Sequence, residues 1–194
     1  MTMGKVCIKG VGEFCHHYPS VAAVVTARVG EKANAMAAAW HSPLSRKPPL
    51  YGVAISPKRF THELILEAGE FGVNFLPFEK AEVIASLGGS TGRKADKFRL
   101  FDIAEEKPVL TSAPILAEAY AAYECQLVSH HTFGDHTWFV GEIVMVHLVE
   151  GALTDEGVLD LSSVKPAMYL GADRYVTTLR ESLCYLDRKA WTKK

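Results

Sequence analysis

The chain has 194 residues, of which 48% are hydrophobic and 22% are charged, and its formal net charge at pH 7 is -1. This length predicts one domain with a full hydrophobic core, and these proportions are ordinary for a globular protein. The balanced charge gives no electrostatic reason to expect nucleic acid or an anionic membrane surface as a partner.

Targeting signals and cysteine chemistry point to the cytoplasm. No apolar run approaches the roughly 20 residues of a membrane-spanning helix, and the first ten residues lack the long apolar segment of a secretory signal. The four cysteines form no C-x-x-C pair, so neither a zinc knuckle nor a thioredoxin-type site is expected. We therefore expect reduced thiols, with Cys125 as a small core residue in an apolar strand pattern.

The first part of the chain predicts three strands. Residues 21–29 are β-branched and apolar, which favours a buried strand. Gly30-Glu31 turns the chain, and residues 33–40 return as a second strand, so this pair is a predicted hairpin. Prolines then interrupt the chain, and residues 50–55 predict a third strand.

A helix start preceded by two cations follows the third strand. Thr61 is a predicted N-cap, and the helix is expected to extend to Ala68 and to end at Gly69. A helix N-terminus offers unpaired N–H groups and the positive end of a dipole, and Lys58 and Arg59 add full charges. This combination suits a phosphate, but a capped surface helix beside two solvated cations has the same pattern.

The middle of the chain predicts a strand over residues 70–76 and a helix over residues 79–87, which Gly88-Gly89 ends. Residues 90–98 are basic and rich in small residues, as is typical of a surface loop. Such a loop could be a plain solvated connection, a disordered segment or a lid over a ligand.

Two long strands and one short strand are predicted in the last third. Residues 115–129 alternate between apolar and polar side chains, and residues 137–149 form the returning strand, with a bulge expected at Gly141-Glu142. Residues 166–170 predict a last short strand. The tail over residues 174–194 contains enough leucine and tyrosine to predict that it docks on another surface.

The number and order of these elements indicate the fold class. Strands outnumber helices and do not alternate strictly with them, which argues against a doubly wound sheet and favours a mainly antiparallel barrel. The chain contains neither a G-x-G-x-x-G after its first strand nor a G-x-x-x-x-G-K-[ST] motif. We therefore expect neither a Rossmann nucleotide site nor a P-loop.

A series of short motifs adds a family resemblance. These motifs are Pro19-Ser-Val-Ala, Val25-Thr26, Asn34-Ala, Trp40-His-Ser-Pro-Leu-Ser45, Pro48-Pro-Leu50, Ser56-Pro-Lys-Arg-Phe-Thr61, Phe71-Gly-Val-Asn-Phe75, Tyr123-Glu-Cys125, Gly134-Asp-His136 and Val140-Gly-Glu142. Over residues 19–175 their order and spacing resemble the flavin reductase-like family of FMN-binding split barrels, which includes the flavoredoxins. The resemblance implies a mainly β fold, a six-stranded antiparallel Greek-key split β-barrel with a few short helices. It also implies one domain over residues 1–194, with residues 176–194 as a tail, and a homodimer with FMN near the subunit interface.

The resemblance implies a flavin site along the small-residue strand and the loop that follows it. The residues that would lie along the isoalloxazine are Met36, Ala37, Ala38, Ala39 and Trp40. The residues that would hold the ribityl chain or the phosphate are Ser42, Ser45, Lys58, Arg59 and Thr61. Many family members carry serine or threonine where this chain has alanine, so backbone N–H groups would supply more of the bonding. FAD in place of FMN stays open for the same reason.

Three further residues complete the implied site. Asn74, on a neighbouring strand, would add a polar contact, and Lys97 would reach the cofactor or the partner subunit from the basic loop. His136 resembles the family position on the nicotinamide side of the flavin and is the one candidate catalytic residue. A turn histidine that caps a backbone carbonyl is the alternative interpretation of His136.

The resemblance implies an NAD(P)H-dependent flavin reductase that transfers hydride to or through bound FMN, and the flavin supplies this chemistry. A flavoredoxin-like electron carrier, which serves a redox protein partner and turns over NAD(P)H poorly, shares the fold and stays open. The sequence does not separate NADH from NADPH. A third hypothesis is a metal-dependent hydrolase that uses His16, His17, His130, His131 and His136. These histidines form no tight ligand motif, so no metal is expected.

Overall fold

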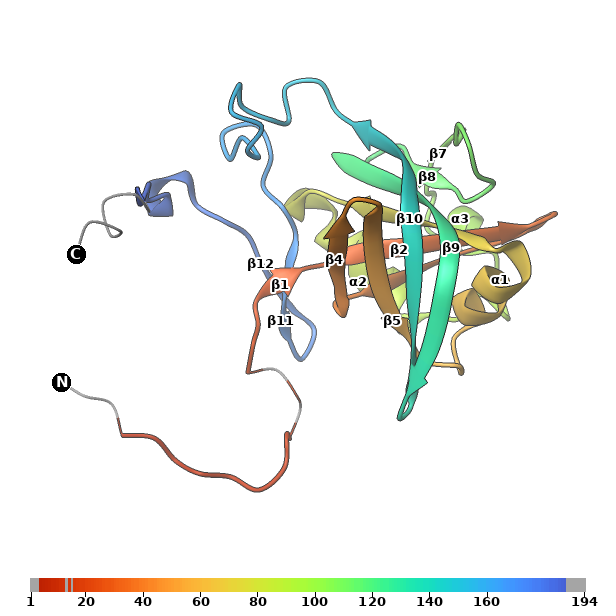
Figure 1. The fold of residues 1–194 in the computed structure, drawn as a ribbon, viewed down its shortest axis with the longest axis horizontal. Helices are drawn as coiled ribbons and strands as arrows, with labels where there is room; N and C mark the ends of the chain where they lie inside the picture. The colour runs from red at the N-terminus through yellow and green to blue at the C-terminus, as the bar shows by residue number, and fades with distance from the viewer. Residues whose placement is uncertain (1–3, 13, 15, 188–194) are drawn as a thin grey trace.

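The computed structural model describes residues 4–12, 14 and 16–187 of the chain. Its main feature is a curled antiparallel sheet with the strand order β3-β2-β6-β9-β10-β5-β4 (Figure 1). The strands are β2 (Ala23–Val29), β3 (Lys32–Ala38), β4 (His41–Arg46), β5 (Pro49–Ile55), β6 (Glu70–Phe75), β9 (Ala121–Phe133) and β10 (His136–Leu148). Contacts join the edge strand β3 to β5, the neighbour of the other edge strand β4, so the sheet curls into a barrel.

Smaller elements surround this barrel. A three-stranded sheet in the order β1-β11-β12 lies beside it, and β7 pairs with β8. These strands are β1 (Ser20–Val21), β11 (Met168–Gly171), β12 (Arg174–Val176), β7 (Glu105–Glu106) and β8 (Ile115–Leu116). The helices are α1 (Phe60–Ala68), α2 (Ala81–Gly89) and α3 (Lys97–Leu100), with short 3₁₀ turns η1 (Phe78–Lys80) and η2 (Arg180–Ser182).

The strand β2 is buried on both faces, which explains its continuous apolar sequence. Successive side chains of a strand point to opposite faces. Val25 accordingly packs in the barrel interior with Phe71 and Phe139, whereas Val24 packs outside the barrel against Ile84 of α2. The helix α2 therefore covers the outer face of the β2–β3 hairpin, and this cover positions the site described below.

A buried carboxylate fixes the long connection before β8. Glu124 of β9 is fully buried and accepts hydrogen bonds from the N–H groups of Val109, Leu110 and Thr111, at 2.7 to 2.8 Å, and from His147 Nε2 at 2.7 Å. Burial alone would raise the pKa of this carboxyl, but the hydrogen bonds outweigh burial and lower the pKa to about 2. Glu124 is therefore ionised and holds the connection on the sheet.

The structure confirms the mainly β class and most of the predicted elements. The β2–β3 hairpin, the long β9–β10 pair and α1 are present, and Gly69 closes α1 in the left-handed conformation at φ 70°. The predicted bulge is a register shift between Val140 and Gly141. A Cβ atom at Gly141 would lie 2.7 Å from the Phe71 ring, so glycine is required where the bulge meets the core. Cys125 is fully buried, and burial raises the pKa of its thiol to about 12, as expected for a core residue.

Three local predictions were wrong. The main sheet has seven strands because β4 forms where prolines predicted a break, and Pro43 is tolerated there since β4 is an edge strand. The N-cap of α1 is Arg59, and Thr61 is a buried residue of the first turn. The predicted strand over residues 115–129 is two strands, because the chain turns at Ala119.

The predicted tail is only partly docked: β12 pairs with β11, but the Leu183 and Tyr185 side chains are exposed. Residues 188–194 of the tail, and Cys15 among the thiols, lie outside the described residues. Segments 4–12 and 177–187 both extend away from the barrel on the same side of the molecule (Figure 1). No helix in the described part of the chain is long and apolar enough to cross a membrane.

Candidate functional site

A recess of about 70 Å³ lies between β3, the start of α1 and the loop over residues 90–96. Its lining includes six of the predicted site residues, which are Met36, Ala37, Lys58, Arg59, Thr61 and Lys97. Lys58 and Arg59 stand immediately before the first turn of α1, where the helix dipole is positive. The recess is therefore suited to an anion at the head of this helix.

Lys97 supplies a buried positive charge to the same recess. Its side chain is only 2% exposed, and Nζ donates to the carbonyl oxygens of Ala35, at 2.9 Å, and Leu87, at 2.8 Å. Burial, and next the positive charge of Arg59, lower the pKa of Lys97 from 10.5 to about 8. An ammonium has three N–H donors, so a third stays available to a ligand.

Asn34 is a site residue that our sequence-based prediction missed. It is 2% exposed, and its Nδ2 donates to Thr61 Oγ1 at 2.8 Å, but Oδ1 has no hydrogen-bond partner. A buried polar atom without a partner is costly, and an amide oxygen can only accept a hydrogen bond, so in this orientation Asn34 needs a donor rather than an anion. With the amide in the opposite orientation, Thr61 would donate to Oδ1 and the NH₂ group would face the recess instead. The only signal in the sequence was a polar residue within an alanine-rich strand.

A second recess of about 430 Å³ continues from the first. The two recesses share Ala37, Arg59 and Gly88, and the alanine run over residues 37–39 lines the second. Tyr169 of β11 and Tyr175 of β12 add aromatic rings, packed edge to face with their centroids 5.4 Å apart. A narrow cationic end that leads to a wider end with small and aromatic side chains fits a flat ring that carries a phosphorylated chain. Our sequence-based prediction of the site included neither tyrosine.

Trp40 and His136 lie in a third, aromatic pocket of about 770 Å³, which touches the second recess at Ala39. The ring centroids of Trp40 and His136 are 4.8 Å apart, and Trp40 Nε1 donates to the Tyr18 hydroxyl at 3.1 Å. His136 Nδ1 lies 2.8 Å from Asp135 Oδ1, and this hydrogen bond lowers the pKa of the Asp135 carboxyl. His136 is thus paired with a carboxylate, whereas our alternative interpretation expected a backbone carbonyl as its partner.

Three predicted residues lie outside both recesses and outside the aromatic pocket. Ser42 and Ser45 belong to β4, where Ser42 Oγ donates to the Pro43 carbonyl and Ser45 Oγ accepts from the Lys47 N–H. Asn74 is fully buried: its amide group donates to the Val24 carbonyl, and its Oδ1 accepts from the Leu116 N–H. Within this chain, Asn74 has a structural role that joins β2, β6 and β8.

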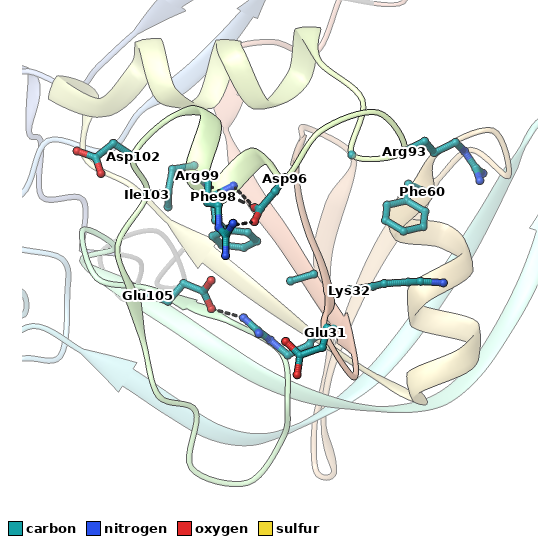
Figure 2. Close-up of a pocket in the computed structure, with 13 residues that line it drawn as sticks. Glu31, Lys32, Phe60, Arg93, Asp96, Phe98, Arg99, Asp102, Ile103 and Glu105 are labelled. Carbon is teal, nitrogen blue, oxygen red and sulfur yellow. Dashed lines mark hydrogen bonds and ion pairs between the residues drawn. The ribbon is translucent and has the colours of Figure 1, made fainter.

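A further groove is large and charged, with a volume of about 870 Å³ (Figure 2). Arg28 is paired with Glu105 in this groove, and Asp96 accepts from the first N–H groups of α3. Arg99 is also paired with Asp96, and none of the predicted site residues lines this groove, so we take the two recesses as the candidate site. Within the described residues, no group of three or more metal-ligating side chains could hold a metal ion, so the hydrolase hypothesis has no site there.

Comparisons with known proteins agree with this geometry. The model of the flavin reductase like domain matches residues 15–178. The FMN-binding protein from Thermus thermophilus, in a structure with bound 1-cyclohex-2-enone, is 39% identical, with 95% of this chain and 99% of that chain covered at a TM-score of 0.81. Flavoredoxin from Methanosarcina acetivorans is 28% identical, with 98% and 100% covered at a TM-score of 0.85.

A protein from Aeropyrum pernix is 34% identical over 178 residues, which are 91% of this chain. They are 66% of the A. pernix protein, so this chain spans slightly less than two thirds of that relative. The match to the family model covers most of the chain, and the structural neighbours are split-barrel flavoproteins with the same strand-rich architecture. The protein therefore belongs to the flavin reductase-like domain family and has the FMN-binding split-barrel fold.

Proposed function

We propose that the two connected recesses hold one FMN molecule and that the protein is an NAD(P)H-dependent flavin reductase. The phosphate occupies the small recess, and the isoalloxazine occupies the wider one along the alanine run. The observation that carries this proposal is the recess at the start of α1, which gathers Lys58, Arg59 and the buried Lys97. The family membership and the FMN-binding protein from T. thermophilus support the choice of flavin.

Residues of the chain hold and orient the cofactor. Lys58, Arg59 and Lys97 compensate the charge of the phosphate, and Thr61 and Asn34 supply polar contacts. The strand β3 is at the edge of the main sheet, so alternate N–H groups of its alanine run point away from β2. These N–H groups are suitably placed to hydrogen-bond the polar edge of the ring and to stabilise negative charge there.

When bound, flavin supplies the hydride chemistry. His136 and Trp40 border the aromatic pocket next to this ring site and are in place to orient the nicotinamide. The T. thermophilus FMN-binding protein has been solved with bound 1-cyclohex-2-enone, which supports a small conjugated carbonyl as a candidate ligand for this protein as well.

The second candidate function is electron transfer to a redox protein, with little NAD(P)H turnover. The similarity to M. acetivorans flavoredoxin favours it. We also propose a cytoplasmic homodimer, which the exposed apolar side chains of both terminal segments support, among them Val6, Ile8, Leu183 and Tyr185. A molar mass in solution equal to that of one chain would contradict the homodimer.

The visible absorption spectrum of the purified protein tests these functions. The spectrum is recorded under argon after FMN is added, and again after NADH or NADPH is added. Flavin bands that persist through gel filtration and then bleach with the nicotinamide support the reductase. Bound flavin whose absorption does not change with NADH or NADPH supports the electron carrier. A protein that retains no flavin contradicts both proposals.

A further inference from the structure

The loop over residues 90–96 forms the outer wall of the small recess. Ser90, Thr91 and Gly92 line the recess, as Asn34 does. A Cβ atom at Gly92 would lie 2.1 Å from Asn34 Oδ1 and 3.1 Å from the Phe60 ring, so the loop backbone lies directly against both residues. A phosphate in the recess would therefore be enclosed by this loop on one side and by α1 on the other.

One side chain ties the tip of this loop to α1. Arg93 makes a two-pronged ion pair with Glu63 of the first turn of α1, with Nη1–Oε2 at 2.8 Å and Nη2–Oε1 at 2.5 Å. The Arg93 guanidinium also lies 5.5 Å from the centre of the Phe60 ring, and Figure 2 shows the two side chains beside each other at one end of the large groove. Arginine matches a carboxylate with two parallel hydrogen bonds, which makes the contact directional.

The other hydrogen bonds between this loop and neighbouring elements are at the two ends of the loop. Ser90 Oγ donates to the Ser86 carbonyl of α2, and Asp96 caps α3. The hydrogen bonds that Arg93 and Lys94 donate through their backbone N–H groups both reach Thr91, within the loop itself. Among the hydrogen bonds and ion pairs of the described residues, those of the Arg93 side chain are thus what hold the tip against α1. Both partners are exposed, and an exposed pair is weak enough to break and reform readily.

We propose that residues 90–96 are a lid on the phosphate recess and that the Arg93–Glu63 pair is its latch. The latch sets how long a phosphorylated flavin stays bound, so Arg93 and Glu63 are positioning residues that act through the lid. This inference rests on the proposed binding of FMN. It predicts an effect on ligands that carry the phosphate and none on riboflavin, which lacks it.

The first test is the rate at which FMN leaves Glu63→Gln. Stopped-flow fluorescence should show release about two- to fivefold faster than from the unchanged protein, as expected for loss of one exposed ion pair. Riboflavin affinity should not change, and the charge-reversed pair of Arg93→Glu with Glu63→Arg should restore slow release. The matched control is Glu118→Gln, which removes the exposed ion pair with Lys80 elsewhere on the surface. Its FMN release should match that of the unchanged protein.

The second test needs no flavin spectrum. Trypsin cleaves after arginine and lysine, and Glu63→Gln leaves both Arg93 and Lys94 in the lid. Cleavage at these residues should be faster in Glu63→Gln than in the unchanged protein, and FMN or inorganic phosphate should slow it in both. Normal FMN binding with unchanged release and unchanged cleavage would overturn the latch alone. A failure of the unchanged protein to bind FMN would overturn the proposed function as well.

Discussion

The buried ammonium of Lys97 makes FMN binding dependent on pH. Without ligand, burial and then Arg59 lower its pKa from 10.5 to about 8, so the side chain loses its proton just above neutral pH. A bound phosphate is an opposite charge beside the ammonium, and it raises the pKa again. The protonated form therefore binds FMN more tightly, and affinity is full below the pKa of the free protein and falls as the pH rises through it.

The size of this effect follows from the pKa of Lys97. If the phosphate restores the ordinary pKa of 10.5, the affinity for FMN falls about tenfold between ~pH 7 and ~pH 9, because only about a tenth of the free protein is then protonated. The phosphate itself does not contribute, since its second pKa is about 6 and it stays dianionic over this range.

Quenching of flavin fluorescence measures this affinity at each pH. The control variant is Lys97→Arg, whose guanidinium stays charged throughout and should make the pH profile flat. Lys97→Met should bind FMN weakly at every pH, also with a flat profile. A constant affinity for FMN in the unchanged protein, or the same tenfold decline in Lys97→Arg, would refute the role that we assign to Lys97.

The other predictions concern the rest of the recess and the stability of the fold. Replacing Lys58 and Arg59 together with alanine should weaken FMN binding by about 1.5–3 kcal/mol for each charged hydrogen bond lost, and an unchanged dissociation constant would place the phosphate elsewhere. Gly92→Ala should also weaken FMN binding, because its Cβ atom would meet Asn34 at 2.1 Å and displace either Asn34 or the loop. Tight FMN binding in this variant would be incompatible with a close-fitting lid. Glu124→Gln should lower the free energy of unfolding by ~3 kcal/mol, since a carboxyl pKa near 2 in place of 4.5 contributes about that much. The unchanged protein should lose this contribution as the pH falls from about 4.5 towards 2, and denaturation curves that are parallel in pH for both proteins would contradict it.

The sequence predicts the framework of the fold because local patterns specify it. The apolar β2 strand, the turn at Gly30 and the glycine that ends α1 are encoded by neighbouring residues, and the structure contains all three. Predictions from neighbouring residues were wrong where contacts with distant parts of the chain determine the local structure. Pro43 predicts an interruption between strands, yet β4 is an edge strand, which tolerates a residue that donates no backbone hydrogen bond. Thr61 is a good N-cap by residue type, but its hydroxyl is used by Asn34 and the chain begins the helix two residues earlier.

The candidate site was predictable only where it is built from one stretch of chain. Lys58, Arg59 and the alanine run are close in sequence, and the structure places them along the connected recesses. Tyr169 joins them because β11 pairs with β1, and no local pattern encodes a pairing between strands nearly 150 residues apart. The unpartnered oxygen of Asn34 is likewise visible only in three dimensions.

The most direct test of the phosphate recess compares the affinities of the flavin-free protein for FMN and for riboflavin. The two ligands share the ring and the ribityl chain and differ only in the phosphate. Because one charged hydrogen bond contributes about 1.5–3 kcal/mol, FMN should bind at least about tenfold more tightly than riboflavin. Equal affinities would contradict a phosphate site at the start of α1, and binding of neither ligand would contradict the flavin site as a whole.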